Sequence, residues 1–137
     1  MPPIYLLDTN VVSYFVRGTS VAVREHLLRT PVAALAISVV TEAELLFWIA
    51  RRPGDARTRV SVRDFLERVP SLAWDSRAAE AYAILRAEQK RKGRPLSTED
   101  LMIAAHALSA GLTLVTHDEA FSYVDGLKTI DWTVSEN

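Results

Sequence analysis

Four acidic residues that are far apart in the chain lie at positions where a fold could bring their carboxylates together into one reactive site. Asp8 and Asp118 each follow a short apolar run, and Glu44 and Asp100 each lie near the start of a helical pattern. Two carboxylates about 4 Å apart repel by about 4 kcal/mol at an effective dielectric constant of about 20. A cluster of them therefore needs a shared proton or a cation, and oxygen ligands of this kind suit Mg²⁺ or Mn²⁺. A divalent cation held in this way can activate water and neutralise charge on a phosphodiester.

Each acid also has a simpler interpretation as a local helix cap. An Asp after a strand is often the N-cap of the next helix. Residues 41–44 (TEAE) fit a capping box, and residues 97–100 (STED) resemble one. An acid in a first helical turn is favoured by the helix dipole as well. The metal-site interpretation thus depends on the fold bringing the four acids to one place.

The elements that would position these acids alternate between strands and helices. Short apolar runs predict strands at 4–7, 32–38 and 112–115, with possible short strands at 72–74 and around 129–132. Apolar residues at helical spacing, bounded by Gly, Pro, Ser or Asp, predict helices in the intervening segments. This order indicates an α/β fold with a short parallel sheet of four to five strands flanked by helices. Right-handed connections would bring the strand ends, and their acids, to one edge.

Composition limits the possible classes of protein. A length of 137 residues suits one domain, spanning 1–137, with a real core. The formal net charge of −1 means that any nucleic-acid surface must be a local patch. The chain has no Cys, which excludes disulfides and thiolate metal sites. We expect no signal peptide and no membrane span, and hence a cytoplasmic protein.

Several short motifs occur in an order typical of one family and together span nearly the whole chain. They are residues 6–10 (LLDTN), 37–45 (ISVVTEAEL), 93–95 (GRP), 100–107 (DLMIAAHA), 114–118 (LVTHD) and the tail from 121 to 132. In these motifs the chain resembles the PIN-domain ribonucleases, and within them the VapC-type toxins of bacterial and archaeal toxin–antitoxin pairs. Each motif alone is modest, whereas the ordered set is specific.

The resemblance implies a PIN-like fold and an endoribonuclease that depends on Mg²⁺ or Mn²⁺. It also implies a homodimer, an RNA substrate and a cognate antitoxin that blocks the site. The acids of the family fall on four residues, which would be both catalytic and metal-binding: Asp8, Glu44, Asp100 and Asp118. Asp8 and Asp100 would bind the cation most directly. Thr9, Asn10 and Thr116 would orient the carboxylates or water. Water would attack the scissile phosphate in line, and the RNA 3′-oxygen would leave.

Two basic clusters are the candidate phosphate-facing surfaces, because backbone neutralisation dominates RNA affinity. Charge runs of this kind are otherwise usually solvated helix ends. The residues that we predict to contact RNA are Arg51, Arg52, Arg91, Lys92 and Arg94. His106 and His117 are more typical of structural histidines than of ligands, since no HExxH motif is present.

Two other functional classes share features with this sequence. A phosphatase of the haloacid dehalogenase type needs a second acid two residues after its nucleophile, and Asn10 occupies that position. A catalytically idle PIN fold that serves as a binding or scaffold module is the stronger alternative. Keeping four acids argues against such a module, because a carboxylate cluster without a metal costs stability.

Overall fold

The computed structural model describes residues 2–93 and 96–134, and Arg94, which we predicted to contact RNA, lies outside them. Within the described residues the fold is α/β, with a single five-stranded, all-parallel sheet in the order β3-β2-β1-β4-β5. The strands are β1 (Tyr5–Leu7), β2 (Leu35–Ser38), β3 (Ser71–Leu72), β4 (Thr113–Val115) and β5 (Thr129–Ile130). The predicted short parallel sheet is thereby confirmed.

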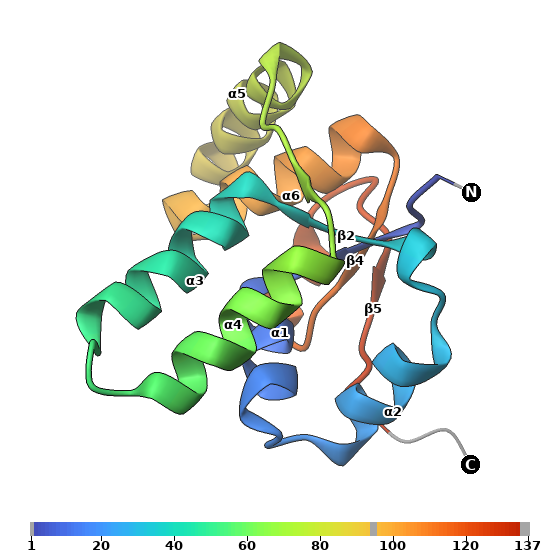
Figure 1. The fold of residues 1–137 in the computed structure, drawn as a ribbon. Helices are drawn as coiled ribbons and strands as arrows, with labels where there is room; N and C mark the ends of the chain where they lie inside the picture. Colours follow the sequence, from blue (N-terminus) through green and yellow to red (C-terminus); the bar gives the residue numbers. More distant parts are fainter. Residues whose placement is uncertain (1, 94–95, 135–137) are drawn as a thin grey trace.

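Helices fill the segments between the strands (Figure 1). The α-helices are α1 (Thr9–Arg17), α2 (Val21–Arg29), α3 (Val39–Arg51), α4 (Ala56–Arg68), α5 (Ser76–Lys92) and α6 (Thr98–Ala110). Two short 3₁₀ helices, η1 (Val32–Ala34) and η2 (Glu119–Tyr123), precede β2 and follow β4. No helix of the described residues has the length and apolar character needed to cross a membrane.

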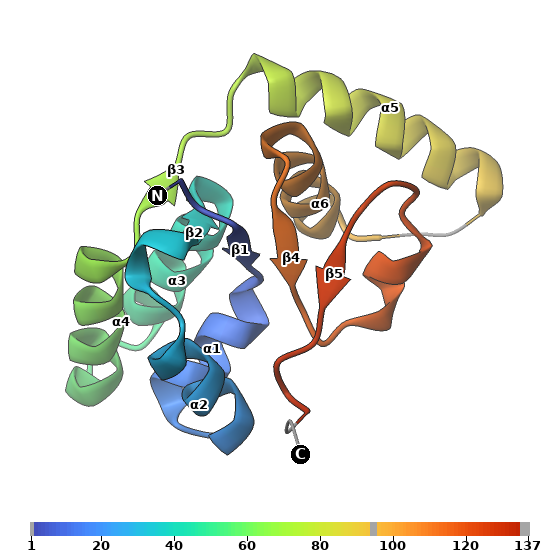
Figure 2. The ribbon, with the colours of Figure 1, turned by 90° about the vertical axis from the view of Figure 1, so that its right-hand side faces the viewer.

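Helices cover both faces of the sheet (Figures 1 and 2), and a separate hydrophobic cluster lies on each face. Successive strand residues point to opposite faces, so Leu7 packs with α1–α4 whereas Leu6 packs with α5 and α6. Leu114 and Val115 divide between the same two layers. Because both faces are covered, the central strands are apolar without interruption, as parallel sheets require.

The strand order reverses between β1 and β4, which form a parallel pair. The chain proceeds from β1 through β2 to β3 on one side, and then returns to place β4 and β5 on the other. In open α/β sheets, ligands bind outside the carboxyl ends of the strands at such a switch point. Asp8 directly follows β1 and Thr116 directly follows β4, so both lie at this position.

Three local predictions are wrong in detail. The helix that carries Glu44 begins at Val39 and is capped by the side chain of Ser38, so Thr41 is no cap and Glu44 lies beyond the first turn. The predicted strand at 72–74 is β3, which ends at Leu72. The last predicted strand, around 129–132, is shorter than expected, since β5 ends at Ile130. Trp132 follows the strand, and its buried ring packs against Tyr5 in the core.

Candidate active site

Asp8 is a buried carboxylate at the switch point, only 4% exposed. It occupies the N-cap position of α1 but makes no side-chain capping bond, so the simple capping interpretation fails. Instead, its Oδ2 accepts a hydrogen bond of 2.9 Å from the hydroxyl of Thr116. Burial raises the pKa of Asp8 to about 6, and the charges of Asp100 and Glu44 add to this rise. A buried acid with two acidic neighbours is typical of a functional site.

Glu44 reaches the site from α3 and is held by the first residue of α1. The Thr9 hydroxyl lies 3.1 Å from Oε1 of Glu44, to which it can donate, and 3.0 Å from the hydroxyl of the buried Thr41. Burial raises the pKa of Glu44, and the negative charges of Glu99 and Asp100 raise it further. Thr9 thus links the start of α1 to the acid on α3.

Asp100 enters from the first turn of α6, on the other side of the sheet from α3. The predicted cap is confirmed, since the Ser97 hydroxyl accepts from the backbone N–H of Asp100 at 3.1 Å. The carboxylate is nevertheless half-buried, and burial raises the pKa of Asp100, with Asp118 and Glu99 adding negative charge. Asp100 therefore combines a capping position with electrostatic contact to the other acids.

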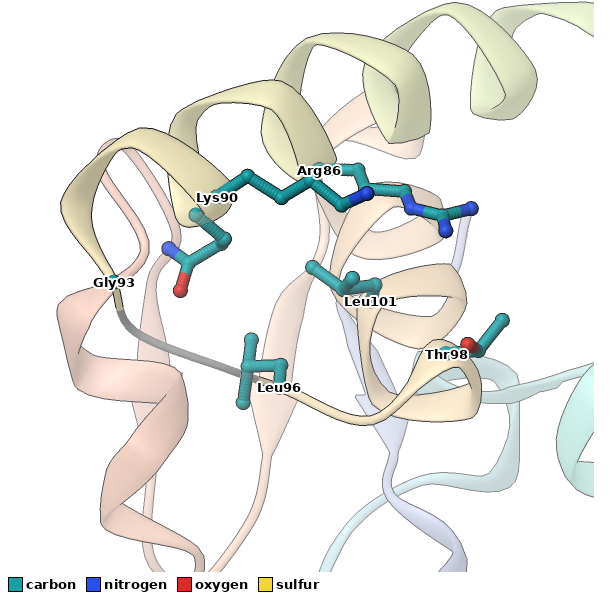
Figure 3. A pocket seen from close by; sticks show the side chains of 7 residues that line it. Arg86, Lys90, Gly93, Leu96, Thr98 and Leu101 are labelled. Carbon is teal, nitrogen blue, oxygen red and sulfur yellow. The ribbon is translucent and has the colours of Figure 1, made fainter.

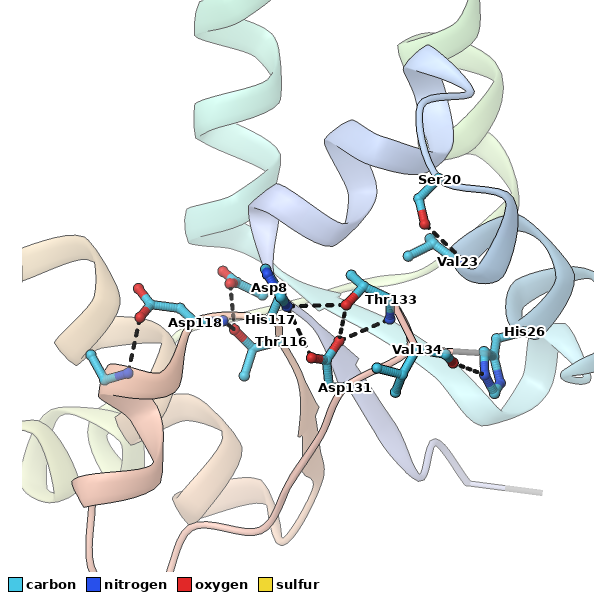
Figure 4. A network of polar contacts seen from close by, with 11 residues as sticks. Asp8, Ser20, Val23, His26, Thr116, His117, Asp118, Asp131, Thr133 and Val134 are labelled. Carbon is cyan, nitrogen blue, oxygen red and sulfur yellow. Dashed lines mark hydrogen bonds and ion pairs between the residues drawn. The ribbon is translucent and has the colours of Figure 1, made fainter. Parts of the chain in front are cut away.

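Asp118 is the most exposed of the four acids, and its carboxylate has a local role. Its Oδ1 accepts from the backbone N–H of Ala120 at 2.9 Å and so caps η2. Its own backbone N–H donates to the Thr116 hydroxyl at 3.1 Å, and the same hydroxyl donates to Asp8 (Figure 4). Thr116 therefore fixes Asp8 and the backbone of Asp118 together.

The acids are electrostatically coupled without forming a closed ligand cage. Asp8 interacts with Asp100 and Glu44, and Asp100 interacts with Asp118. Across residues 2–93 and 96–134, no three His, Cys, Asp or Glu side chains are assembled as a preformed metal site. The donor set still fits a hard divalent cation, because it is all oxygen and because neighbouring negative charges help to raise the pKa of Asp8, Glu44 and Asp100. Rotation of these carboxylates toward a cation would relieve that repulsion.

A second polar cluster joins the loop after β4 to the segment after β5 (Figure 4). The Nδ1 of His117 lies 2.9 Å from Oδ2 of Asp131 and 3.0 Å from the hydroxyl of Thr133. The hydrogen bond with Asp131 raises the pKa of the exposed His117. This cluster ties down the loop that also contains Thr116 and Asp118.

His106 has a structural role, as the absence of an HExxH motif indicated. It is buried, and its Nδ1 lies 2.7 Å from the hydroxyl of Ser38, which also accepts from the backbone N–H of Val40. Burial lowers the pKa of His106, so the ring is kept neutral. The contact fixes α6 against the start of α3, and these two helices carry Asp100 and Glu44.

The other predicted residues lie outside this network. Asn10 is exposed and has no side-chain hydrogen bond to any described residue. Arg51 lies over the ring of Phe47, 5.5 Å from its centroid, and Arg52 is exposed beside it. The sequence did not predict the hydrogen bond between the Thr9 and Thr41 hydroxyls, or that the charge of Glu99 raises the pKa of Glu44 and Asp100. Both depend on the packing of α1, α3 and α6.

Lys92 and Arg91, both predicted to contact RNA, have acidic partners. The Nζ of Lys92 lies 2.9 Å from Oδ2 of Asp125, and Arg91 lies 4.0 Å from Glu88. These exposed ion pairs reduce the charge that either residue can offer to a phosphate.

Comparison with known proteins agrees with this fold. The sequence model described as "PIN domain" matches residues 5–127. The chain is 35% identical to a "tRNA(fMet)-specific endonuclease VapC" of Shigella flexneri, over 94% of this chain and 98% of that protein. It is 30% identical to "Ribonuclease VapC2" of Haemophilus influenzae strain Rd, over 93% and 97%. A crystal structure of DNA-bound VapBC from Salmonella typhimurium matches with a TM-score of 0.88 and 31% identity, over 95% and 98% of the two chains.

Proposed function

The chain belongs to the PIN-domain family, and we propose that it is a cytoplasmic, divalent-cation-dependent endoribonuclease that acts as the toxin of a toxin–antitoxin pair. Its relatives that match over nearly their whole length are named as VapC ribonucleases. One observation carries the proposal. Asp8 is a buried acid with a pKa of about 6, at the switch point of the sheet and within the field of Glu44 and Asp100. A protein gains nothing in stability from such a group unless a cation compensates it.

Each residue of the site then has a distinct task. Asp8 and Asp100 would hold Mg²⁺ or Mn²⁺, with Glu44 and Asp118 completing the set. The Thr116 hydroxyl fixes the rotamer of Asp8 by donating to Oδ2. When bound, the cation activates water and neutralises charge on the phosphate. Water would lose a proton and attack the phosphorus in line, the bond to the 3′-oxygen would break, and that oxygen would take up a proton, so that the products carry a 5′-phosphate and a 3′-hydroxyl.

The test is cleavage of RNA by the purified protein with Mg²⁺, with Mn²⁺ and with EDTA. The wild-type protein should cleave only when a divalent cation is present. Asp8→Asn should remain folded and lose cleavage, and sequencing of RNA 5′ ends after induced expression would identify the target. Undiminished cleavage by Asp8→Asn would refute the assignment of the site.

The same variants distinguish the nuclease from an idle scaffold of the same fold. A cation that binds only the folded protein raises the melting temperature. Mn²⁺ should therefore stabilise the wild-type protein and leave Asp8→Asn unaffected. A wild-type protein that neither cleaves RNA nor responds to Mn²⁺ would be a binding module instead.

An apolar groove between α1, α2 and α4 is where we propose that the antitoxin binds. It has a volume of about 260 Å³, and Phe15, Leu28 and Phe65 are among its lining residues. Leu28 is 66% exposed, which favours burial against a partner. Similar structures include VapBC complexes, such as the one from Salmonella typhimurium. Leu28→Arg should abolish co-purification with the antitoxin encoded beside the toxin, while RNA cleavage persists. We further propose a homodimer, which light scattering would test.

A further inference from the structure

A cavity of about 380 Å³ lies between the second half of α5 and the start of α6 (Figure 3). Its volume falls within the range of about 300–1,000 Å³ that is typical of small-ligand sites. Arg86, Gln89 and Lys90 line it from α5, and Thr98 and Leu101 line it from α6. Gln89 and Lys90 follow Arg86 by three and four positions, so both lie on the same side of α5 as Arg86.

The cationic groups of this cavity are available to a ligand. Arg86 and Lys90 are exposed, and among the described residues no carboxylate lies within ion-pair distance of either. Arg86 donates a hydrogen bond only to the hydroxyl of Tyr82, on its own helix. Figure 3 shows Arg86 and Lys90 extending from α5 above Leu101. By contrast, the neighbouring Arg91 lies close to Glu88.

Gln89 is a largely buried residue whose amide is free to bind a ligand in the cavity. Only 5% of the residue is exposed, it lines the cavity, and its amide has no hydrogen bond to any described residue. No side-chain nitrogen or oxygen of the described residues is both fully buried and without a hydrogen-bond partner, so the Gln89 amide keeps contact with solvent in the cavity, where a ligand can reach it. An amide offers donors and an acceptor together, which suits the edge of a nucleic-acid base.

The cavity adjoins the proposed catalytic acids through a shared helical turn. Thr98 and Leu101 line it, and Asp100 lies between them in the sequence. Asp100 does not line the cavity itself, because residues one and two positions apart on a helix face different ways, but a ligand seated there contacts the same turn of α6 that carries this acid. Apolar Leu101 on one wall and cations on the other match the two parts of a nucleotide, a flat base and an anionic phosphate.

We infer that this cavity binds one unpaired nucleotide of the RNA substrate, beside the bond that is cleaved. The inference rests on the proposed ribonuclease function and deepens it. Arg86 and Lys90 contact the phosphate, Leu101 contacts the base, and the Gln89 amide reads the base edge. The cavity thus selects the cleavage sequence at one position, whereas the acids act on any phosphodiester.

Binding is measured by fluorescence anisotropy with labelled single-stranded RNA of randomised sequence, in EDTA so that no cleavage occurs. Arg86→Gln and Lys90→Gln should each weaken binding by about three- to tenfold and lower the slope of log affinity against log salt by about one. Arg77→Gln is the matched control, because it removes an exposed charge from the other end of α5. Equal losses in all three variants, or none in Arg86→Gln and Lys90→Gln, would overturn the inference.

Base reading is measured by sequencing the products of the same RNA pool after cleavage with Mn²⁺. The wild-type protein should prefer particular bases at a position next to the cut. Gln89→Leu keeps a buried side chain of similar size, so it should fold and cleave, with the preference at that position reduced about tenfold. A wild-type preference that Gln89→Leu leaves unchanged would refute base reading by this cavity.

The two arms separate failure of this inference from failure of the proposed function. If the wild-type protein cleaves RNA but the cavity variants match it in affinity and preference, the cavity inference is wrong and the nuclease stands. If the wild-type protein does not cleave, while Arg86→Gln and Lys90→Gln lose RNA binding and Arg77→Gln does not, the cavity is an RNA site and the nuclease proposal is wrong.

Discussion

Replacing Asp8 by asparagine should stabilise the cation-free protein even though it removes activity. The carboxylate of Asp8 is buried, and its pKa is raised to about 6 by that burial and by the charges of Asp100 and Glu44. Asparagine has the same shape and no charge, and its Oδ1 can accept the hydrogen bond from Thr116. The substitution therefore removes an unfavourable charge while it keeps the packing.

The size of the effect follows from the pKa. A rise from 3.8 to about 6 corresponds to about 3 kcal/mol, because one pKa unit is worth about 1.36 kcal/mol. The folded protein holds this proton more tightly than the unfolded chain does, so the penalty is absent well below pH 3.8 and complete above pH 6. At pH 8 the variant should be more stable by up to about 3 kcal/mol, and at pH 5 by about half of that.

Urea unfolding in EDTA at pH 8 and at pH 5 measures this difference. Asp64→Asn is the control, since Asp64 forms an exposed ion pair with Arg68 at 3.4 Å, and such pairs contribute little. Addition of Mn²⁺ at about a hundred times its dissociation constant should then stabilise the wild-type protein alone, by about 2.7 kcal/mol.

One result would refute this reasoning. If Asp8→Asn is no more stable than the wild-type protein at pH 8 in EDTA, and the difference does not shrink at pH 5, Asp8 is not an uncompensated buried charge. The electrostatic argument for a cation at this site would then fail, whatever the family resemblance suggests.

Further predictions concern the groups that support the site. Thr116→Val should weaken Mn²⁺ binding by about 10- to 100-fold in calorimetric titration, because Asp8 loses its hydroxyl donor, and Thr116→Ser should restore it. Ser38→Ala should lower the free energy of unfolding by about 1–3 kcal/mol in urea, since Nδ1 of His106 is left buried without a partner. The rate of RNA cleavage at subsaturating Mg²⁺ should rise between pH 5 and pH 7 as Asp8 loses its proton; a flat profile would contradict this assignment.

The sequence was informative wherever a signal is local. Apolar runs such as 112–115 predicted buried strands, and the capping pattern of residues 97–100 predicted the start of α6, which Ser97 caps in the structure. The four acids and the order of the motifs pointed to the fold and to the class of chemistry. Gly111, which follows the last residue of α6, shows how a local signal works. Its φ of 68° is a conformation that glycine adopts readily and other residues adopt at a cost.

Local sequence patterns gave wrong predictions where the same residues fit two different structural roles. Glu44 fitted a capping box, yet the helix starts earlier at Val39, because the Ser38 side chain caps it and also contacts His106. Arg91 and Lys92 were the expected RNA contacts because they lie in a charge run. Their pairing with Glu88 and Asp125 depends on side-chain geometry that the charge run does not specify.

The sequence by itself determined which residues could carry chemistry, and only the tertiary structure decided which of them act together. Asp8 and Thr116 are 108 positions apart and become partners because β1 and β4 pair at the point where the strand order reverses. The raised pKa of Asp8 likewise arises from burial and from the charges of Asp100 and Glu44. Burial and the distance between charges are properties of the packed chain, since they depend on residues brought together from all along the sequence.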